Sequence, residues 1–226
     1  MTRIPKVAVL LAGCGHMDGA EVREAVLTLL ALDQQGAHYQ CLAPNLAQAH
    51  VINHATGKVV EGATRNILEE ASRISRFGQC LDIAKASAET FDALLIPGGF
   101  GVAKNLCDFA FKGTEAQVNP EVAGFITAFF KAKKPVGAIC IAPALVALCL
   151  AQSQVSSLLT LGDGTEIQAA MEKLGHRFKS VPSAREIAID EDLKLITTPA
   201  YMFDEARLGD VWIGIDRCVS EVLRRI

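Results

Sequence analysis

The 226-residue sequence lacks the features that mark membrane, nucleic-acid-binding and secreted proteins. No window holds the ~18 apolar residues that a membrane-spanning helix needs, so no such helix is expected. The 22 basic and 25 acidic side chains give a net charge of −3, and no cluster of Lys and Arg stands out. We therefore expect neither a nucleic acid nor an anionic membrane surface as a partner. The N-terminal residues run into a short apolar stretch without a signal-peptide cleavage pattern.

The sequence also lacks the Cys-x-x-Cys motif of zinc ribbons and thioredoxin-type sites, because no two of its seven cysteines have that spacing. A chain of this length is unlike the short, cysteine-dense disulfide scaffolds. Free thiols in a reducing compartment are the better interpretation, so we expect the protein in the cytoplasm. Since the count is odd, at least one thiol of a monomer stays unpaired. The cysteines are Cys14, Cys41, Cys80, Cys107, Cys140, Cys149 and Cys218.

Apolar residues make up 50% of the chain and charged residues 21%, which suffices for a large core and excludes global disorder. Short apolar runs alternate with helical apolar spacing, the pattern of an α/β layer sandwich around a mostly parallel sheet. We expect one domain over residues 1–226, with a loop excursion at residues 45–62. Strands are predicted at residues 7–12, 39–43, 91–96, 136–139, 158–161, 187–189 and 193–197, and helices at residues 21–36, 64–74, 120–131, 142–150, 166–174 and 205–225.

The predicted helices carry expected caps and inward faces. Asp18 and Gly19 are predicted to form the cap region of the first helix, and Thr64 to cap the second. The residues expected to face the core are Val22, Ala25, Val26, Leu29 and Leu30 in the first helix and Val211, Ile215, Val219 and Val222 in the last.

The strongest functional signal is a cysteine between a buried strand and a helix. Residues 135–143 read Pro-Val-Gly-Ala-Ile-Cys-Ile-Ala-Pro, so Cys140 ends an apolar strand just before a helix begins. This is the layout of a nucleophile elbow. A helix N-terminus lowers the pKa of a thiol, and the amide of Ile141 is placed to stabilise an oxyanion. The alternative is a buried cysteine that only packs. Three other cysteines are interpreted in that way: Cys41, Cys149 and Cys218.

A glycine-rich turn follows the strand predicted at residues 91–96. It reads Pro-Gly-Gly-Phe-Gly over residues 97–101, and its place at the carboxyl edge of a parallel sheet puts it beside Cys140. Adjacent glycines let backbone amides approach a ligand closely, and Gly99 is the expected second oxyanion donor. Because Gly-Lys-Ser/Thr is absent, the turn is not a phosphate loop. A plain tight turn is the alternative.

Two carboxylates of the first helix are candidate partners for the thiol. Glu21 and Glu24 lie one turn apart, just beyond the carboxyl end of the first strand. A buried carboxyl here can hold a proton and donate a hydrogen bond to a thiolate, or act as a general acid and base. The alternative is that both glutamates only stabilise the helix dipole.

Together these segments resemble the ThiJ/PfpI superfamily, which has the class I glutamine amidotransferase-like fold. Closer matches are similar to the bacterial ElbB proteins and extend in order over nearly the whole chain. They lie at residues 13–21, 51–57, 64–66, 98–105, 140–143 and 197–202. The resemblance implies a flavodoxin-like, three-layer α/β sandwich, a homodimer, and a link by name to isoprenoid biosynthesis.

The resemblance also implies an activity and its residues. ElbB-related proteins are described as glyoxalases that convert glyoxal-type aldehydes to hydroxyacids without glutathione, so we expect a small aldehyde as substrate and no cofactor. The reactive cysteine falls on Cys140. Its carboxyl partner, counted back from Gly36 at the helix end, falls on Glu24, with Glu21 as the nearby alternative. Four further residues are candidates for the pocket: Cys14, Gly98, Asn53 and His54.

The chain departs from the superfamily at its histidines. Ile141 stands where many superfamily proteases and chaperones carry a histidine, and none of the five histidines is followed two residues later by Glu, as in glutaminases. His176 is the sole histidine after Cys140 and is interpreted as structural. We therefore expect a Cys–carboxylate mechanism, or a histidine from elsewhere in the chain. His50 and His54 are four residues apart but lack a third ligand, so no metal site is predicted.

Two hypotheses from different classes remain. In the first, a cofactor-free glyoxalase uses the Cys140 thiolate to attack the aldehyde carbon, the Gly99 and Ile141 amides stabilise the alkoxide, and Glu24 moves the proton between the two carbons. In the second, the protein is not catalytic, and oxidation of Cys140 serves redox sensing or changes a partner interface. A third possibility, an amidotransferase subunit, is weakened by the missing His-x-Glu pair.

Overall fold

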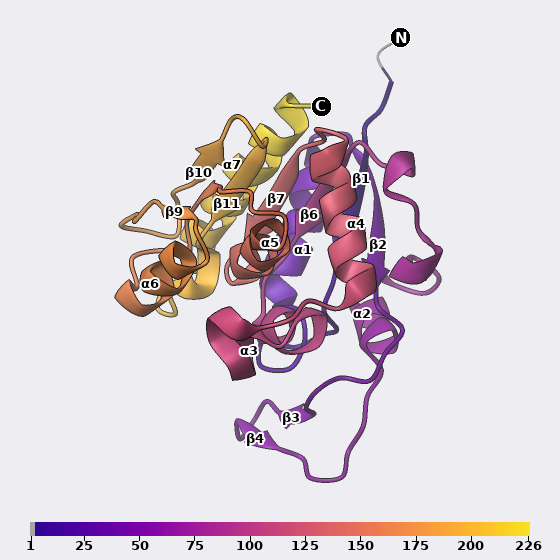
Figure 1. Ribbon diagram of the computed structural model, residues 1–226. Coiled ribbons are helices and arrows are strands. Elements are labelled where there is room, and N and C mark those ends of the chain that lie inside the picture. The colour runs from indigo at the N-terminus through magenta and orange to yellow at the C-terminus, as the bar shows by residue number, and fades with distance from the viewer. Residues whose placement is uncertain (1–2) are drawn as a thin grey trace.

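A seven-stranded sheet lies at the centre of the computed structural model, which describes residues 3–226 (Figure 1). Its strands are β1 (Lys6–Leu10), β2 (His38–Ala43), β5 (Cys80–Asp82), β6 (Ala93–Ile96), β7 (Val136–Ile139), β10 (Ala188–Asp190) and β11 (Leu195–Thr198). In space they follow the order β10-β11-β7-β6-β1-β2-β5. All neighbouring pairs are parallel except β10 and β11, which are antiparallel. The predicted α/β fold with a mostly parallel sheet is confirmed.

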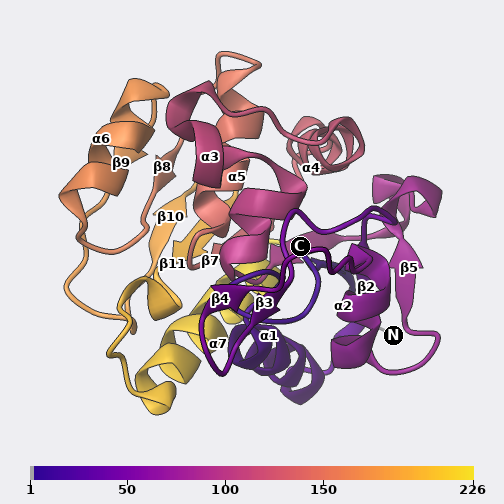
Figure 2. The same cartoon turned by 90° about the horizontal axis from the view of Figure 1, so that it is seen from below.

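Helices cover both faces of this sheet and produce three layers (Figures 1 and 2). On one face lie α1 (Val22–Gln34), α2 (Ile67–Ser75) and α7 (Leu208–Arg224); on the other lie α4 (Pro120–Lys131) and α5 (Ala142–Ala151). The central strands β6, β7 and β11 are buried at every position because both faces are covered. This explains why they read as continuous apolar runs rather than as alternating ones.

Smaller elements surround the sandwich. The hairpin β3 (Ile52–Asn53) and β4 (Lys58–Val59) is antiparallel, and β8 (Leu158–Leu159) pairs in parallel with β9 (Arg177–Phe178). The remaining helices are α3 (Phe109–Lys112), α6 (Thr165–Lys173), the π-helix η3 (Val102–Leu106) and the 3₁₀ turns η1 (Ile83–Lys85), η2 (Ala88–Thr90), η4 (Gly113–Glu115) and η5 (Ala200–Met202). Each predicted strand and helix overlaps an observed one, although the strand predicted at residues 158–161 pairs outside the central sheet.

The inward face of α1 was predicted correctly for Ala25, which is fully buried, but wrongly for three of the five residues named. Val22, Val26 and Leu30 are 41–48% exposed, whereas Glu24 and Thr28 are fully buried. Apolar residues occur around most of this helix, so their spacing did not single out one face. The buried line instead follows the side that packs on the sheet and α7, where small and polar side chains fit. For α7 the prediction is confirmed, since all four residues named are fully buried.

The helix caps also differ from the prediction. Glu21 caps α1, and its side chain accepts a hydrogen bond from the amide of Glu24. Asn66 caps α2 through the amide of Glu69, so Thr64 lies two residues too early. Asp18 is unable to act as the first cap because its carboxylate is used elsewhere, by the amide of Ile52 at 2.7 Å.

The excursion at residues 45–62 contains the β3–β4 hairpin and projects from the end of the sheet where the parallel strands finish (Figure 1). Seen from that end, it lies across the carboxyl edge between the two helical layers (Figure 2).

The edge strand β5 was not predicted, because three residues with one apolar side chain give no periodic signal. Within residues 3–226, no helix combines the length and apolar character needed to cross a bilayer.

Candidate active site

Cys140 occupies a strained turn directly after β7. Its backbone φ is 61°, in the left-handed region that costs a non-glycine residue ~1–2 kcal/mol. The turn is held because the Cys140 amide donates to the carbonyl of Thr198 at 2.9 Å, and α5 begins two residues later at Ala142. This is the predicted strand–cysteine–helix geometry, which raises a side chain above the carboxyl edge of a sheet.

Glu24 lies against this cysteine in the interior of the protein. Its carboxyl is fully buried and accepts hydrogen bonds from the amide of Gly98 at 3.0 Å and from the amide of Tyr201 at 3.1 Å. Its carboxyl also lies next to the Cys140 thiol, and each group affects the pKa of the other. The three contacts come from the loops after β6, β11 and β7, so Glu24 joins the carboxyl ends of three strands. Of the two candidate carboxylates, the structure brings Glu24 to the thiol.

The surroundings of Glu24 favour its protonated form. Burial, and secondarily the charge of Glu21, raise the pKa of Glu24 to about 8. The contacts with Tyr201, Cys140 and Gly98 act in the opposite direction but do not offset burial. At neutral pH the carboxyl therefore carries a proton. Because both backbone contacts are donors, the Cys140 sulfur is the acceptor to which this proton can be directed.

Burial also changes the expectation for Cys140 itself. The residue is only 7% exposed, and burial, followed by the Glu24 carboxylate, raises the pKa of its thiol. The amides of Gly99 and Ile141 lie next to the sulfur and lower the pKa of the thiol, but they do not outweigh burial. The prediction that the helix N-terminus leaves a thiol of lowered pKa is therefore wrong for the resting protein. The two amides expected to meet an oxyanion are instead directed at the sulfur.

Glycines let the loop after β6 pass close to this pair. A Cβ atom on Gly98 would stand 2.3 Å from the Cβ of Cys140 and 2.5 Å from a Glu24 oxygen, distances that no side chain tolerates. On Gly99 it would stand 2.2 Å from the amide nitrogen of Glu21. Other amides of the loop are occupied, since Phe100 donates to the carbonyl of His16 and Gly101 to that of Gly19. The loop thus leaves the Gly99 amide for the sulfur.

A pocket of about 570 Å³ opens above the sulfur. Of the residues predicted for the site, four contribute to its wall: Glu21, Gly99, Cys140 and Ile141. Glu24 and Gly98 lie behind the sulfur and do not line the pocket, nor do Cys14, Asn53 and His54. Seven lining residues were not predicted: His16, Met17, Arg23, Phe100, Tyr201, Met202 and Asp204.

Glu21 has a structural task on the pocket wall. One of its carboxylate oxygens accepts from the Glu24 amide at 2.7 Å, and the other accepts from Nε of Arg23 at 3.0 Å. The Arg23 guanidinium in turn lies 4.2 Å from the centre of the Tyr201 ring. Glu21 is thus fixed by two donors, and it acts on Glu24 through its charge.

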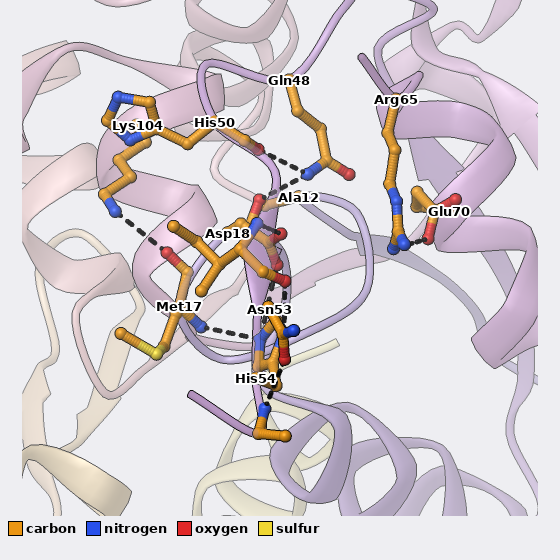
Figure 3. Close-up of polar contacts among 12 residues, drawn as sticks. Ala12, Met17, Asp18, Gln48, His50, Asn53, His54, Arg65, Glu70 and Lys104 are labelled. Carbon is orange, nitrogen blue, oxygen red and sulfur yellow. Dashed lines mark hydrogen bonds and ion pairs between the residues drawn. The ribbon is translucent and has the colours of Figure 1, made fainter. Parts of the chain in front are cut away.

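The excursion meets the loop after β1 through a set of polar contacts (Figure 3). Nε2 of Gln48 donates to the carbonyls of Asp18 and His50, and Nε2 of His54 lies 3.4 Å from Oδ1 of Asp18. Cys14 belongs to the same loop; it is half-buried, and burial raises the pKa of its thiol. These contacts fix the shape of the loop that carries His16 and Met17 into the pocket.

The family can now be assigned. A profile of the DJ-1/PfpI family matches residues 6–197, most of the chain. The chain belongs to the DJ-1/PfpI family. This confirms the resemblance to the ThiJ/PfpI superfamily, and the DJ-1/PfpI fold is the one described above.

Relatives of this DJ-1/PfpI chain extend over nearly its full length. The human "glutamine amidotransferase-like class 1 domain-containing protein 3, mitochondrial" is 40% identical over 96% of this chain and 82% of its own length. The zebrafish "ES1 protein, mitochondrial" is 31% identical over 96% of this chain and 85% of its own. A crystal structure of an "isoprenoid biosynthesis protein with amidotransferase-like domain" from Ehrlichia chaffeensis is 37% identical, with a TM-score of 0.90 over 98% and 99% of the two chains.

The unpredicted pocket residues of this DJ-1/PfpI chain left only an indirect signal. Tyr201 and Met202 belong to the matched segment at residues 197–202, and His16 lies between two matched glycines and Asp18. Pocket residues from three loops and the first turn of α1 have no common spacing, so no motif describes them. Within residues 3–226, no three His, Cys, Asp or Glu side chains gather as a metal site would require.

Proposed function

We propose that this protein is a cofactor-free glyoxalase that adds water to glyoxal, or a related small 2-oxoaldehyde, and releases a hydroxyacid. The observation that carries the proposal is the buried pair of Cys140 and Glu24 at the base of a pocket, with two backbone amides on the sulfur. Membership of the DJ-1/PfpI family supports a cysteine-centred site but does not specify this reaction.

In the proposed first step, the Cys140 sulfur attacks the aldehyde carbon and forms a carbon–sulfur bond. The thiol proton is released to water before the attack, so the sulfur attacks as the thiolate while Glu24, the titratable group behind the sulfur, keeps the one proton of the pair. The electron pair of the carbonyl moves to oxygen, and we propose that the Gly99 amide stabilises the resulting negative charge, because Gly99 lies on the pocket wall. Once the sulfur is bound to carbon it no longer carries a negative charge, so the Gly99 or Ile141 amide becomes free to donate to the substrate oxygen.

The expected role of Glu24 in moving a proton between substrate carbons does not suit the geometry. Its carboxyl is fully buried, both oxygens accept backbone hydrogen bonds, and it does not line the pocket. Its access is to the sulfur alone. The carbon-to-carbon proton transfer requires another group.

The sensor hypothesis has less support. A thiol that senses oxidants is accessible and of lowered pKa, whereas Cys140 is 7% exposed and burial raises its pKa.

The reducing compartment inferred from the free thiols still favours the cytoplasm for this chain, while the names of the two animal relatives assign those proteins to mitochondria.

Glycolate formation from glyoxal tests the proposal. Wild-type protein should produce glycolate without glutathione or added metal. Cys140→Ser should reduce the rate to background, and Glu24→Gln should lower kcat by about 10²- to 10⁴-fold because the thiol loses its proton partner. Activity is measured by product formation at neutral pH.

The controls separate the site from a general effect of thiol loss. Cys14→Ser and Cys80→Ser remove half-buried thiols that do not line the pocket, so both should keep wild-type activity. Equal glyoxal turnover by wild type and Cys140→Ser would rule out the proposed chemistry. Circular dichroism of each variant confirms that the fold is retained.

A further inference from the structure

We propose that His16 is the group that transfers the proton between the two carbons of the bound substrate, an inference that rests on the proposed function. His16 is the only one of the five histidines among the residues that line the pocket with Cys140. Its side chain is exposed at the pocket, so it is accessible to a substrate attached to the sulfur.

The other titratable groups of the pocket are less suited to this step. Both oxygens of Glu21 are held by Arg23 and the Glu24 amide. The Arg23 guanidinium is a donor only and does not deprotonate in proteins. Burial raises the pKa of the Tyr201 hydroxyl, so at neutral pH this group keeps its proton and is not a base. Asp204 is the competing carboxylate, and its variant is part of the test. A neutral imidazole accepts a proton at one nitrogen and returns it from the same atom, as an internal proton transfer requires.

The backbone of His16 is tied to the sulfur-binding loop. Its carbonyl accepts a hydrogen bond of 2.7 Å from the amide of Phe100, the residue after Gly99. Gly99 in turn directs its amide to the Cys140 sulfur. The histidine and the nucleophile are therefore placed by the same two interlocked loops. This explains why a histidine far from Cys140 in sequence lies at its pocket.

His54 holds the ring of His16 from outside the pocket. The two rings meet edge to face, with centres 5.2 Å apart. Nδ1 of His54 donates to the carbonyl of Ile52, at 3.1 Å, because a carbonyl only accepts. Its Nε2 lies 3.4 Å from both the amide of Met17 and Oδ1 of Asp18 (Figure 3). His54 is thus a positioning residue, fixed on three sides.

Asp18 completes the support from a buried position. It is 1% exposed, and its Oδ2 accepts from the amide of Ile52 at 2.7 Å. Its Oδ1 is buried, makes no hydrogen bond and lies 3.4 Å from Nε2 of His54. A buried carboxylate oxygen without a donor is costly, and its retention beside a histidine pair indicates a functional task.

The remaining histidines are occupied elsewhere or lie outside the pocket. His176 is buried, with Nε2 against the carbonyl of Ala147 and Nδ1 against Ser157. His50 packs edge to face on Phe111, and His38 begins strand β2.

The step balances without an added oxidant or reductant. After sulfur has added to one carbon of glyoxal, His16 removes the hydrogen of that carbon as a proton. With the first oxygen protonated by water, the electron pair moves to the neighbouring carbonyl oxygen and forms an enediolate, and the proton of the first oxygen passes to the second. His16 then returns the proton to the second carbon, which gives the thioester of glycolic acid. One carbon is oxidised and the other reduced, and water cleaves the thioester to free the thiol.

The test compares His16→Ala with wild type in the glyoxal assay, with and without added imidazole. We expect kcat to fall by about 10²- to 10⁴-fold, the usual contribution of a general acid–base group. Because His16 is exposed at the pocket, added imidazole should restore part of the rate in a concentration-dependent manner. A purely structural role would not give such rescue. His38→Ala serves as the matched control and should retain full activity.

The outcomes distinguish this inference from the proposed function. If wild type forms no glycolate, the proposed function itself fails. If wild type is active and dependent on Cys140, but His16→Ala keeps full activity, His16 is not the proton-transfer group. Loss of activity in Asp204→Asn together with an active His16→Ala would assign the step to Asp204 and overturn the inference.

The role of His54 has its own readout. His54→Ala should lower kcat with little change in KM, since the substrate still binds but the His16 ring is no longer held. His54→Phe keeps a ring against His16 and should recover much of kcat. An unchanged kcat in His54→Ala would show that His54 does not position His16.

Discussion

Glu24 illustrates how one side chain can link segments that are distant in sequence. It comes from α1, accepts hydrogen bonds from the loops after β6 and β11, and meets the cysteine that follows β7. Gly98 is the reason these groups fit, since any Cβ at that position would overlap both the carboxyl and Cys140. A buried carboxyl of raised pKa is costly to ionise, and that cost can be measured.

The stability of the protein should depend on pH through Glu24. Below its ordinary pKa of 4.5, both the folded and the unfolded chain carry the proton. Between pH 4.5 and about 8 only the folded chain keeps it, so the Glu24 contribution to the unfolding free energy should fall as pH rises. The slope is about 1.4 kcal/mol per pH unit over this range. Urea unfolding of wild type at several pH values measures it.

Glu24→Gln isolates this contribution. In this variant the side-chain NH₂ group faces a backbone N–H donor, which lowers the unfolding free energy by the same amount at every pH. The Gln side chain does not titrate, so the pH-dependent contribution is absent. Its deficit relative to wild type should therefore shrink from pH 5 to pH 8. Glu121→Gln, an exposed glutamate in the first turn of α4, should run parallel to wild type. Parallel curves for Glu24→Gln and wild type would contradict a raised pKa at Glu24.

At the scale of the elements, the site is made by turns and helix ends rather than by helix or strand interiors. Cys140 lies between β7 and α5, the glycine loop follows β6, and the His16 loop follows β1. The strand order of the sheet changes direction between β1 and β6, and the carboxyl ends of two strands at such a point form a crevice. Helices at other positions contribute stability without contributing to this crevice.

Helix α4 is a case in which an end affects stability alone. Asn119 caps it, with Oδ1 accepting from the amides of Glu121 at 2.9 Å and Val122 at 3.3 Å. Asn119→Ala should lower the unfolding free energy by about 1 kcal/mol, because two amides lose their acceptor. Asn119→Ser keeps a capping oxygen and should stay close to wild type. Neither should change glycolate formation, since the residue does not line the pocket.

Thermal or urea unfolding together with the glyoxal assay checks this prediction. A large loss of activity in Asn119→Ala, with stability reduced by no more than the expected amount, would show that α4 is coupled to the pocket.

At the scale of the whole molecule, the sandwich separates the thiols by depth. Cys149 and Cys218 are fully buried, Cys41 is 1% exposed, and Cys14 and Cys80 are half-buried near the surface. All seven are free, so depth rather than bonding controls their reactivity. Core positions become accessible only when the sheet and its helices separate.

Thiol labelling of the native protein should follow this order. Iodoacetamide should modify Cys14 and Cys80 first, while Cys149 and Cys218 should react only at the rate of global unfolding, because burial removes both access and thiolate. Peptide mass spectrometry over time measures each rate. Labelling of Cys218 as fast as Cys14 in the native protein would contradict the packing of α7 on the sheet.

The fold was largely predictable because its signals are local. Continuous apolar runs bounded by glycine or proline mark the buried strands, and residues 120–131 and 136–139 were predicted with the observed bounds. The inward face of α1 was not predictable, since its apolar residues surround the helix. There, polar Glu24 and Thr28 take the buried side because of what the neighbouring elements offer.

The sequence alone determined the α/β sandwich, the elbow cysteine, the glycine loop and two candidate carboxylates, because each depends on spacing within a short segment. Only the tertiary structure decided that Glu24 rather than Glu21 meets the thiol, that burial raises the pKa of both partners, and that His16 enters the pocket. These properties arise between segments more than a hundred residues apart or from exclusion of water. Neither distance across the sheet nor depth below the surface is encoded in local spacing.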